Sequence, residues 1–190
     1  MAINYPTSLD TFTNPNASSL LTLPSHAQQH SDINDAVEAL QTKVAIGNTV
    51  LGTYTAYTPT FPSGLTLGNG VVTSEYCRVN DFVHYWGRVV WGTTTSINNF
   101  GLQVSLPVSH DSNFSSTTGM YTGFAAFRDA STGVPYIGVV RPIETFPNIA
   151  SLACQNIQNT YLAAATVQTA VPFTWAVSDI ITWSMYYQAA

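Results

Sequence analysis

The sequence predicts a mainly β protein with an extended N-terminal arm, one short coiled-coil helix and a C-terminal antiparallel β-sandwich or jelly-roll head. Three observations support this fold class. Apolar residues recur at helical spacing in a single stretch, residues 25–47. From residue 54 onward they alternate with polar residues, and turn-forming residues divide the chain into several short strands. No second helix is indicated, which favours an antiparallel sandwich.

The composition excludes several classes of function. Of the 190 residues, 45% are hydrophobic, which is enough for a core, whereas only 8% are charged, far below the usual quarter. The formal net charge of −5 argues against a nucleic-acid partner, which needs a basic face. No apolar run approaches the roughly 20 residues of a membrane span, and no secretion-signal pattern opens the sequence. A neutral surface rich in Thr, Ser and Asn is typical of assembled shells and fibres.

Residues 1–24 form the predicted arm. Three prolines, Pro6, Pro15 and Pro24, bias the residues before them toward extended backbone. A disordered tail is the alternative, but the segment holds too many apolar side chains for a tail that remains in water. We expect the arm to order when it docks on a neighbour or a larger assembly. Its predicted anchoring side chains are Tyr5, Leu9, Phe12 and Leu20.

Residues 25–47 form the predicted helix, and residues 48–53 the linker after it. Ser25 and Gln28 have the spacing of a capping box, and Gly47 suits a left-handed C-cap. An apolar seam at heptad positions a and d consists of Ile33, Val37, Leu40 and Val44. This seam either packs on the body of its own chain or joins identical subunits in a short parallel coiled coil. We predict the coiled coil.

His26 and His30 continue the same seam toward the start of the helix. Polar residues in a seam reduce stability but can fix the register and the oligomeric state. Three copies of His30 around an axis could also hold an anion or a metal ion. The simpler interpretation is that both histidines lie in the solvent-exposed first turns of the helix. We adopt it, and we predict no metal site and no cofactor.

The head, residues 54–190, contains one especially clear hairpin. Asn80 and Asp81 suit a two-residue turn, which places Tyr76 opposite Tyr85 and predicts a core-facing side for this hairpin. The other side carries Glu75, Cys77, His84, Trp86 and Arg88. Glu75 is diagonal to Arg88, so we expect a cross-strand ion pair between them. This face is then either exposed to solvent or covered by a partner subunit.

The rest of the head is predicted as further strands and loops. We expect a polar loop over 92–100, a strand over 101–107, a long Ser/Thr loop over 109–119 and a hairpin over 120–142 that turns at 129–133. One or two strands follow within 149–167. In the last strand, alternate residues face the core, namely Ile181, Trp183, Met185 and Tyr187. Cys77 and Cys154 are predicted as buried free thiols.

Two motifs carry a resemblance to a known group of proteins. The first, from Asn4 to Gly47, is NYPTSLDTFTNP followed by HAQQHSDINDAVEALQTKVAIG. The second comprises GLTLGNGVVTSEYCRVNDFVHYWGRVVWGTTT and the terminal PFTWAVSDIITWSMYYQ. The first resembles an N-terminal module of tailed-bacteriophage virion appendage proteins, meaning minor tail, head-fibre or decoration proteins. The second is similar to the small β-sandwich at the ends of such proteins, although Ser178-Asp179 departs from the Gly-Asp turn usual there.

The resemblance implies a structural protein on the virion surface that is assembled in the bacterial cytoplasm. It implies a homotrimer in contact with capsid or tail proteins, and it implies no catalytic residue. The residues themselves agree with the last point. Of the head's six acidic residues, three lie in predicted turns and one faces Arg88, and nothing in the sequence pairs the others as polysaccharide cleavage requires. We therefore predict that the protein is not an enzyme.

A receptor-binding adhesin that recognises host surface glycans is the alternative function. Aromatic rings flanked by Asn, Ser and Thr can stack on sugars and hydrogen-bond their hydroxyls. The loop candidates are Asn98, Asn99, Phe100, Asn113, Phe114 and Tyr121, with Phe146 as a further aromatic. Each of these side chains has a competing interpretation, which is packing in the core or in a subunit interface.

Overall fold

The computed structural model describes residues 26–44, 52–113, 121–158 and 161–190, and only the backbone of residues 41–44, 157–158 and 161–162. The chain divides into two compact units, Met1–Thr53 and Tyr54–Ala190, and each is described by itself. The division coincides with the predicted start of the head at residue 54. The predicted arm and residues 48–51 of the predicted linker lie outside the described residues.

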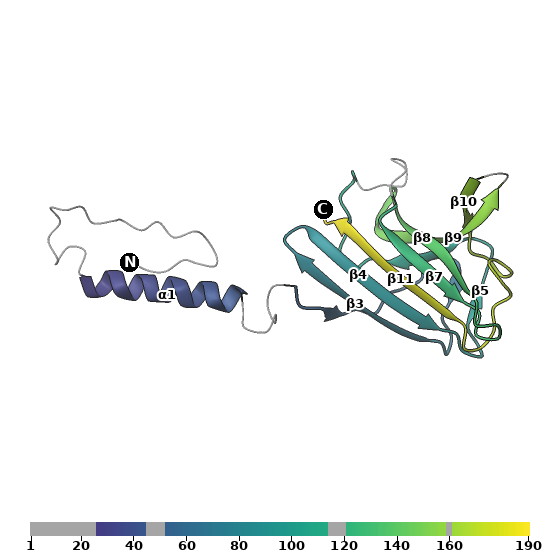
Figure 1. Cartoon of the computed structure of the whole chain (residues 1–190), viewed down its shortest axis with the longest axis horizontal. Coiled ribbons are helices and arrows are strands. Elements are labelled where there is room, and N and C mark those ends of the chain that lie inside the picture. The colour runs from purple at the N-terminus through teal and green to yellow at the C-terminus, as the bar shows by residue number, and fades with distance from the viewer. Residues whose placement is uncertain (1–25, 45–51, 114–120, 159–160) are drawn as a thin grey trace. The chain divides into compact units, whose positions relative to one another are not determined.

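The first unit contains helix α1, His26–Val44 (Figure 1). Its apolar residues recur every three or four positions, and Ala36 and Ala39 have high helix propensity. The predicted caps, Ser25 and Gly47, lie outside the described residues. In the part of the chain that the structure describes, α1 is the only helix, as the sequence predicts.

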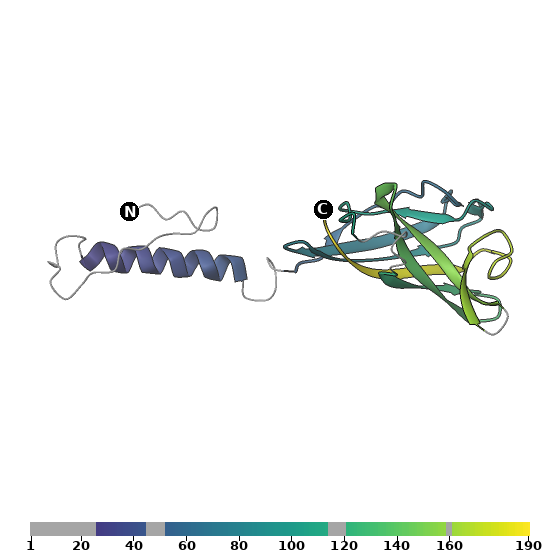
Figure 2. The same ribbon diagram turned by 90° about the horizontal axis from the view of Figure 1, so that it is seen from above.

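The second unit is built from antiparallel strands, which Figures 1 and 2 show from two sides. The strands are β1 (Thr55–Ala56), β2 (Leu65–Thr66), β3 (Val71–Val79), β4 (Phe82–Val90), β5 (Ser96–Ile97), β6 (Leu102–Ser105), β7 (Gly123–Arg128), β8 (Pro135–Ile143), β9 (Phe146–Gln158), β10 (Tyr161–Thr166) and β11 (Ile180–Gln188).

Nine strands form one sheet in the order β1-β3-β4-β11-β7-β8-β9-β10, with β6 also paired to β9, while β2 and β5 form a separate two-stranded sheet. The last strand, β11, lies between β4 and β7 and so connects the two hairpins (Figure 1). The mainly β, antiparallel class is therefore confirmed. The two stacked sheets of a sandwich or jelly roll remain a prediction.

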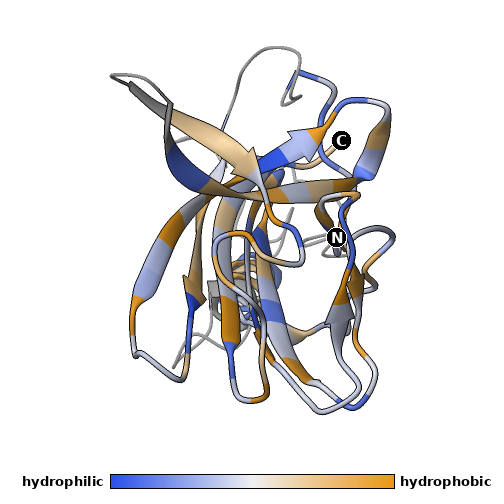
Figure 3. Cartoon of the chain, turned by 90° about the vertical axis from the view of Figure 1, so that its right-hand side faces the viewer, coloured by the Kyte–Doolittle hydropathy of each residue, from blue (hydrophilic) through white to orange (hydrophobic). Residues whose placement is uncertain are grey.

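The β3–β4 hairpin has the predicted register. Val79 pairs with Phe82 and Tyr76 with Tyr85 across the Asn80-Asp81 turn. Asn80 has a φ of 53°, a left-handed conformation that asparagine adopts more readily than most residues. Figure 3 shows hydrophobic and hydrophilic stretches interspersed along the strands of the head. A local pattern of period two and a two-residue turn are thus sufficient to set this pairing.

The segment after β1 runs from one edge of the large sheet to another. Tyr57 N–H donates to Ser74 O of β3 at 3.0 Å, whereas Thr60 O and Ser63 O accept from Ser105 N and Gln103 N of β6 at 2.9 and 3.0 Å. Residues 57–63 therefore connect the edge at β3 with the edge at β6, and backbone groups at both edges are satisfied.

The core of the head is formed by the inward side of the sheet and by residues of β2, β5 and β6. Its largest fully buried side chains include Tyr85, Phe127, Leu102, Leu152 and Tyr187. Ile181, Trp183, Met185 and Tyr187 of β11 are all buried, so the predicted alternation of the last strand is confirmed.

The prediction of a polar loop over residues 92–100 is wrong in part. Ser96–Ile97 form β5 and pair with Leu65–Thr66 of β2. Ile97 is only 8% exposed and belongs to the core. A single apolar residue among threonines and asparagines gives no periodic signal, so only the contact with β2 reveals its role.

Candidate interaction surfaces

Helix α1 carries an apolar stripe on its surface, defined here as Ile33, Val37 and Leu40. Their exposed fractions are 54%, 45% and 50%. Spacings of four and three place the three side chains on one face of the helix. Val44, the last residue of the predicted seam, belongs to α1, but its side chain is not described. The stripe is the surface that the predicted coiled coil would bury.

The two histidines of the seam contact each other at the start of α1. His26 Nε2 lies 3.0 Å from His30 Nε2. The ring centroids are 4.4 Å apart, and the ring planes meet at 76°. Both side chains are exposed. The spacing of four residues brings the two rings together on consecutive turns of the helix.

Several predicted site residues lie outside the described part of the chain. They are the four anchoring residues Tyr5, Leu9, Phe12 and Leu20, and the glycan candidate Phe114. Their roles remain predictions.

The outward face of the β3–β4 hairpin differs from the prediction in one respect. The expected ion pair between Glu75 and Arg88 is not formed: Arg78–Asp81, at 3.5 Å, is the one salt bridge among the described residues. Glu75 lies directly opposite Trp86, and Arg88 opposite Thr73, so the two charges are only diagonal neighbours. Cys154 is buried and Cys77 only half-buried, and both are free thiols.

An aromatic cluster covers part of the same outward face where β4 meets β11. The ring of Tyr186 stacks on His84 at 4.3 Å and on Phe82 at 5.7 Å between centroids. His84 Nδ1 lies 2.5 Å from the Tyr54 hydroxyl, and His84 Nε2 lies 2.9 Å from Ser184 Oγ. Partial burial lowers the pKa of His84 from its ordinary value. These contacts hold the Tyr186 ring in a defined orientation.

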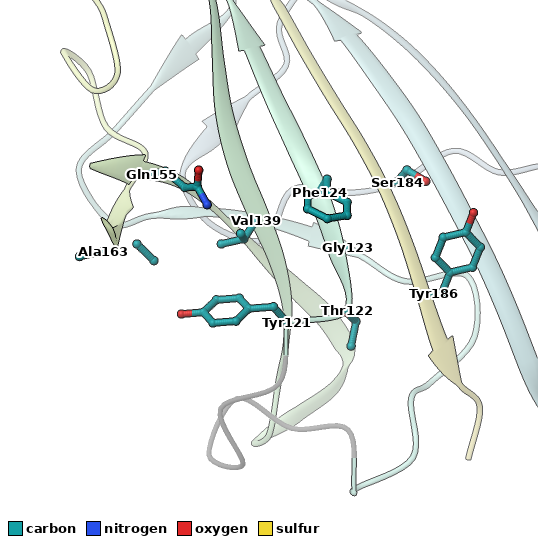
Figure 4. A pocket seen from close by; sticks show the side chains of 10 residues that line it. Tyr121, Thr122, Gly123, Phe124, Val139, Gln155, Ala163, Ser184 and Tyr186 are labelled. Carbon is teal, nitrogen blue, oxygen red and sulfur yellow. The ribbon is translucent and has the colours of Figure 1, made fainter. Parts of the chain in front are cut away.

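An open groove of about 560 Å³ begins beside Tyr186 and extends across β7, β8, β9 and β10. Figure 4 shows its aromatic side chains, Tyr121, Phe124 and Tyr186, together with the polar groups of Gln155 and Ser184. Phe124 pairs with Ser184 on one side and with Val139 on the other, and its side chain is 75% exposed. The described residues that line the groove are all uncharged.

A second, more polar groove of about 400 Å³ lies near β6 and β9. Phe100, which is 82% exposed, lines it together with Gln103, Arg141, Ser151 and Thr166. The structure thus places two of the predicted glycan candidates, Tyr121 and Phe100, in different grooves.

The three predicted asparagines make contacts that support loops. Asn98 Oδ1 accepts from Phe100 N at 2.9 Å, and Asn99 Oδ1 accepts from Thr169 Oγ1 at 2.9 Å. Asn113 is exposed, and its backbone N–H donates to Asp111 Oδ1 at 2.7 Å. Phe146, predicted on a loop, is instead the first residue of β9.

Phe124, Gln155 and Tyr186 were not among the predicted glycan candidates, which were chosen from loops. The period-two pattern does contain part of the signal, since Phe124 and the buried Phe127 are three residues apart and must face opposite sides of β7. No local pattern indicates that Tyr186 of β11 lines the same groove as Tyr121, because the two residues are 65 positions apart in the sequence.

Two acidic residues of the head, Asp179 and Asp129, hold backbone groups in place. Asp179 is buried, and its carboxylate accepts from Ala130 N at 2.8 Å and Ala176 N at 2.6 Å. Asp129 Oδ1 accepts from Ser131 N at 2.8 Å within the β7–β8 turn. His110, next to the serine-rich loop, is buried and its Nδ1 lies 2.8 Å from Asp111 O. These contacts give each residue a structural role.

Within the described residues, no group of three or more His, Cys, Asp or Glu side chains gathers in a way that could hold a metal ion. No helix among the described residues combines the length and the apolar content needed to cross a membrane.

Comparisons with known protein families, curated proteins and solved structures find no match to this chain.

Proposed function

We propose that the protein is a structural subunit of a bacteriophage virion, a homotrimeric fibre or decoration protein with its head facing outward. The observation that carries the assembly is the apolar stripe of α1, with Ile33, Val37 and Leu40 each about half exposed. The virion role itself rests on the resemblance of the two sequence motifs to phage appendage proteins. An exposed stripe of this kind on a short helix stabilises the helix only when a partner covers it.

A second copy of the same helix is the partner that fits the stripe. Its heptad spacing is that of a parallel coiled coil, in which a and d side chains interlock. The number three comes from the resemblance to phage appendage proteins, since valine at a with leucine at d would by itself favour a dimer. We also propose that the head belongs to the sandwich type found at the ends of such proteins.

The arm, residues 1–24, attaches the proposed trimer to capsid or tail proteins. Docking of Tyr5, Leu9, Phe12 and Leu20 would contribute about 1.5–3 kcal/mol for each fully buried side chain. Ordering the arm offsets much of this, so a single arm binds weakly. Three arms on one stalk bind far more tightly, because the second and third attachments are intramolecular. The proposal includes no catalytic role, cofactor or nucleic-acid partner.

Light scattering on the full chain tests the assembly. The expected result is a mass three times that of the 20.5-kDa chain, and a monomer at micromolar concentration would contradict the proposal. Deletion of residues 2–22 tests the attachment. We expect a soluble oligomer that no longer copurifies with virions, whereas normal copy number on particles would place the anchor elsewhere.

An adhesin for host surface glycans is the second candidate function. The observation that favours it is the groove lined by Tyr121, Phe124 and Tyr186, whose exposed rings and neutral polar groups suit an uncharged sugar. The two functions are compatible, since the proposed trimer presents its heads outward. A glycan array probed with the full chain tests this candidate. If the array retains no protein on any glycan, the adhesin function is contradicted and only the structural role remains proposed.

A further inference from the structure

The Nε2 atoms of the two histidines of α1 lie within hydrogen-bond distance of each other, a spacing that also suits chelation of one metal ion. The two Nε2 atoms are 3.0 Å apart, and both side chains are exposed. Two nitrogens that bind one metal ion at about 2.1 Å and lie 3.0 Å apart subtend about 90° at the ion. This angle is that of neighbouring ligands in octahedral or square-planar coordination. Opening the pair to about 3.4 Å would give the tetrahedral angle that zinc prefers.

Contrary to the prediction of no metal site from the sequence, we propose that His26 and His30 of each chain bind one divalent transition-metal ion through their Nε2 atoms. Imidazole nitrogen is a preferred ligand of Zn²⁺, Ni²⁺ and Cu²⁺. Each ring would carry its proton on Nδ1 and direct the Nε2 lone pair at the ion. Water completes the coordination in a single chain.

The two other histidines of the chain lack this arrangement. His84 already contacts Tyr54 through Nδ1 and Ser184 through Nε2. His110 is buried, and its ring nitrogens lie near the backbone oxygens of Asp111 and Ile143. Close approach of two exposed imidazole nitrogens is thus specific to α1 among the four histidines.

A metal ion at this position would join two consecutive turns at the start of α1. Both ligands come from one helix, so the ion binds the helical state and stabilises it relative to the unfolded segment. The site therefore does not depend on the proposed assembly. Metal binding would nevertheless help to order the helix that carries the apolar stripe.

Calorimetric titration of the untagged full chain with ZnCl₂, after chelator treatment, tests the site. The expected result is one Zn²⁺ bound per chain, with a rise in helical circular dichroism during the titration. His26→Ala and His30→Ala should each weaken binding at least tenfold, and alanine preserves helix propensity. The matched control is His84→Ala, which removes a head histidine and should bind as the wild type does. Absence of Zn²⁺ uptake by the wild type, or uptake by either α1 variant equal to that of the wild type, would overturn the site.

Light scattering on the same samples separates this inference from the proposed assembly. A trimer that binds no Zn²⁺ overturns the metal site and leaves the assembly intact. A monomer that binds one Zn²⁺ through both histidines supports the metal site and overturns the assembly.

Discussion

Gly87 of β4 lies directly opposite Trp183 of β11, and the indole ring fills the space that a side chain at position 87 would occupy. A Cβ at Gly87 would overlap three carbon atoms of that ring. Because β11 joins the β3–β4 hairpin to β7, this contact stabilises the centre of the sheet.

Gly87→Ala should therefore destabilise the head. Overpacking of a filled core costs about 1–3 kcal/mol, and we expect a loss of that size in urea unfolding followed by tryptophan fluorescence. Trp183→Phe provides the paired variant, since the smaller ring frees the space and Trp183 Nε1 has no hydrogen-bond partner among the described residues. The double variant should lose less stability than the sum of the two single variants. Simple additivity would contradict the contact.

Ser178→Gly should stabilise the head. Ser178 has a φ of 75°, a left-handed conformation that costs a residue with a Cβ about 1–2 kcal/mol and that glycine adopts freely. The measurement is the midpoint of thermal unfolding. Val177→Gly is the control: the neighbouring residue has an ordinary φ, so glycine there should destabilise. A lower midpoint for Ser178→Gly would show that the serine hydroxyl outweighs the backbone strain.

Leu40→Asp should dissociate the proposed oligomer. Each subunit would place a carboxylate in the seam, which costs several kcal/mol per assembly. We expect a smaller mass by light scattering and a loss of helical signal, with the β signal of the head retained. Ser31→Asp adds the same charge at an exposed position of α1 outside the apolar stripe and should leave the mass unchanged. If Leu40→Asp keeps both its mass and its helix, the seam assignment is wrong.

The stability of the head should fall on acidification in part because of His84. Partial burial lowers the pKa of His84 in the folded state. The His84 imidazole therefore binds a proton more readily in the unfolded chain than in the folded one. The stability that neutral His84 contributes is fully present above the unfolded pKa of about 6.5. It is lost as the pH falls through that value toward the folded pKa. Urea unfolding at about pH 7.5 and about pH 5 should show a smaller decrease for His84→Gln than for the wild type. Equal decreases would exclude this role.

Binding of a neutral glycan, if the adhesin function holds, should require the groove beside β7. Tyr121→Ala and Phe124→Ala each remove an exposed ring that lines it. We expect at least a tenfold loss of affinity, which corresponds to about 1.4 kcal/mol, for a glycan identified on the array. Phe100→Ala is the matched control, because Phe100 lines the other groove. If only Phe100→Ala lost affinity for the glycan, the binding site would instead be the groove that contains Arg141.

Local features of the fold could be predicted from the sequence. The register of β3 with β4 follows from a two-residue turn and from side chains that alternate over a few residues. The turn at 129–133 has a similar local cause, since Asp129 binds the backbone of the residues that follow it and Gly133 has a φ of 73°. The apolar spacing of α1 likewise lies within a few turns of helix.

The sequence alone therefore predicts the mainly β class, a helix with its apolar stripe, and the core-facing residues of individual strands. Which strands pair with each other follows from the tertiary structure. The position of β11 between β4 and β7 brings Tyr186 to His84 and to the groove with Tyr121 and Phe124. It also pairs Gly87 with Trp183, and β2 draws Ile97 into the core. The physical reason is that periodicity records which side of a strand is buried, whereas the pairing of distant strands depends on the fit of whole surfaces.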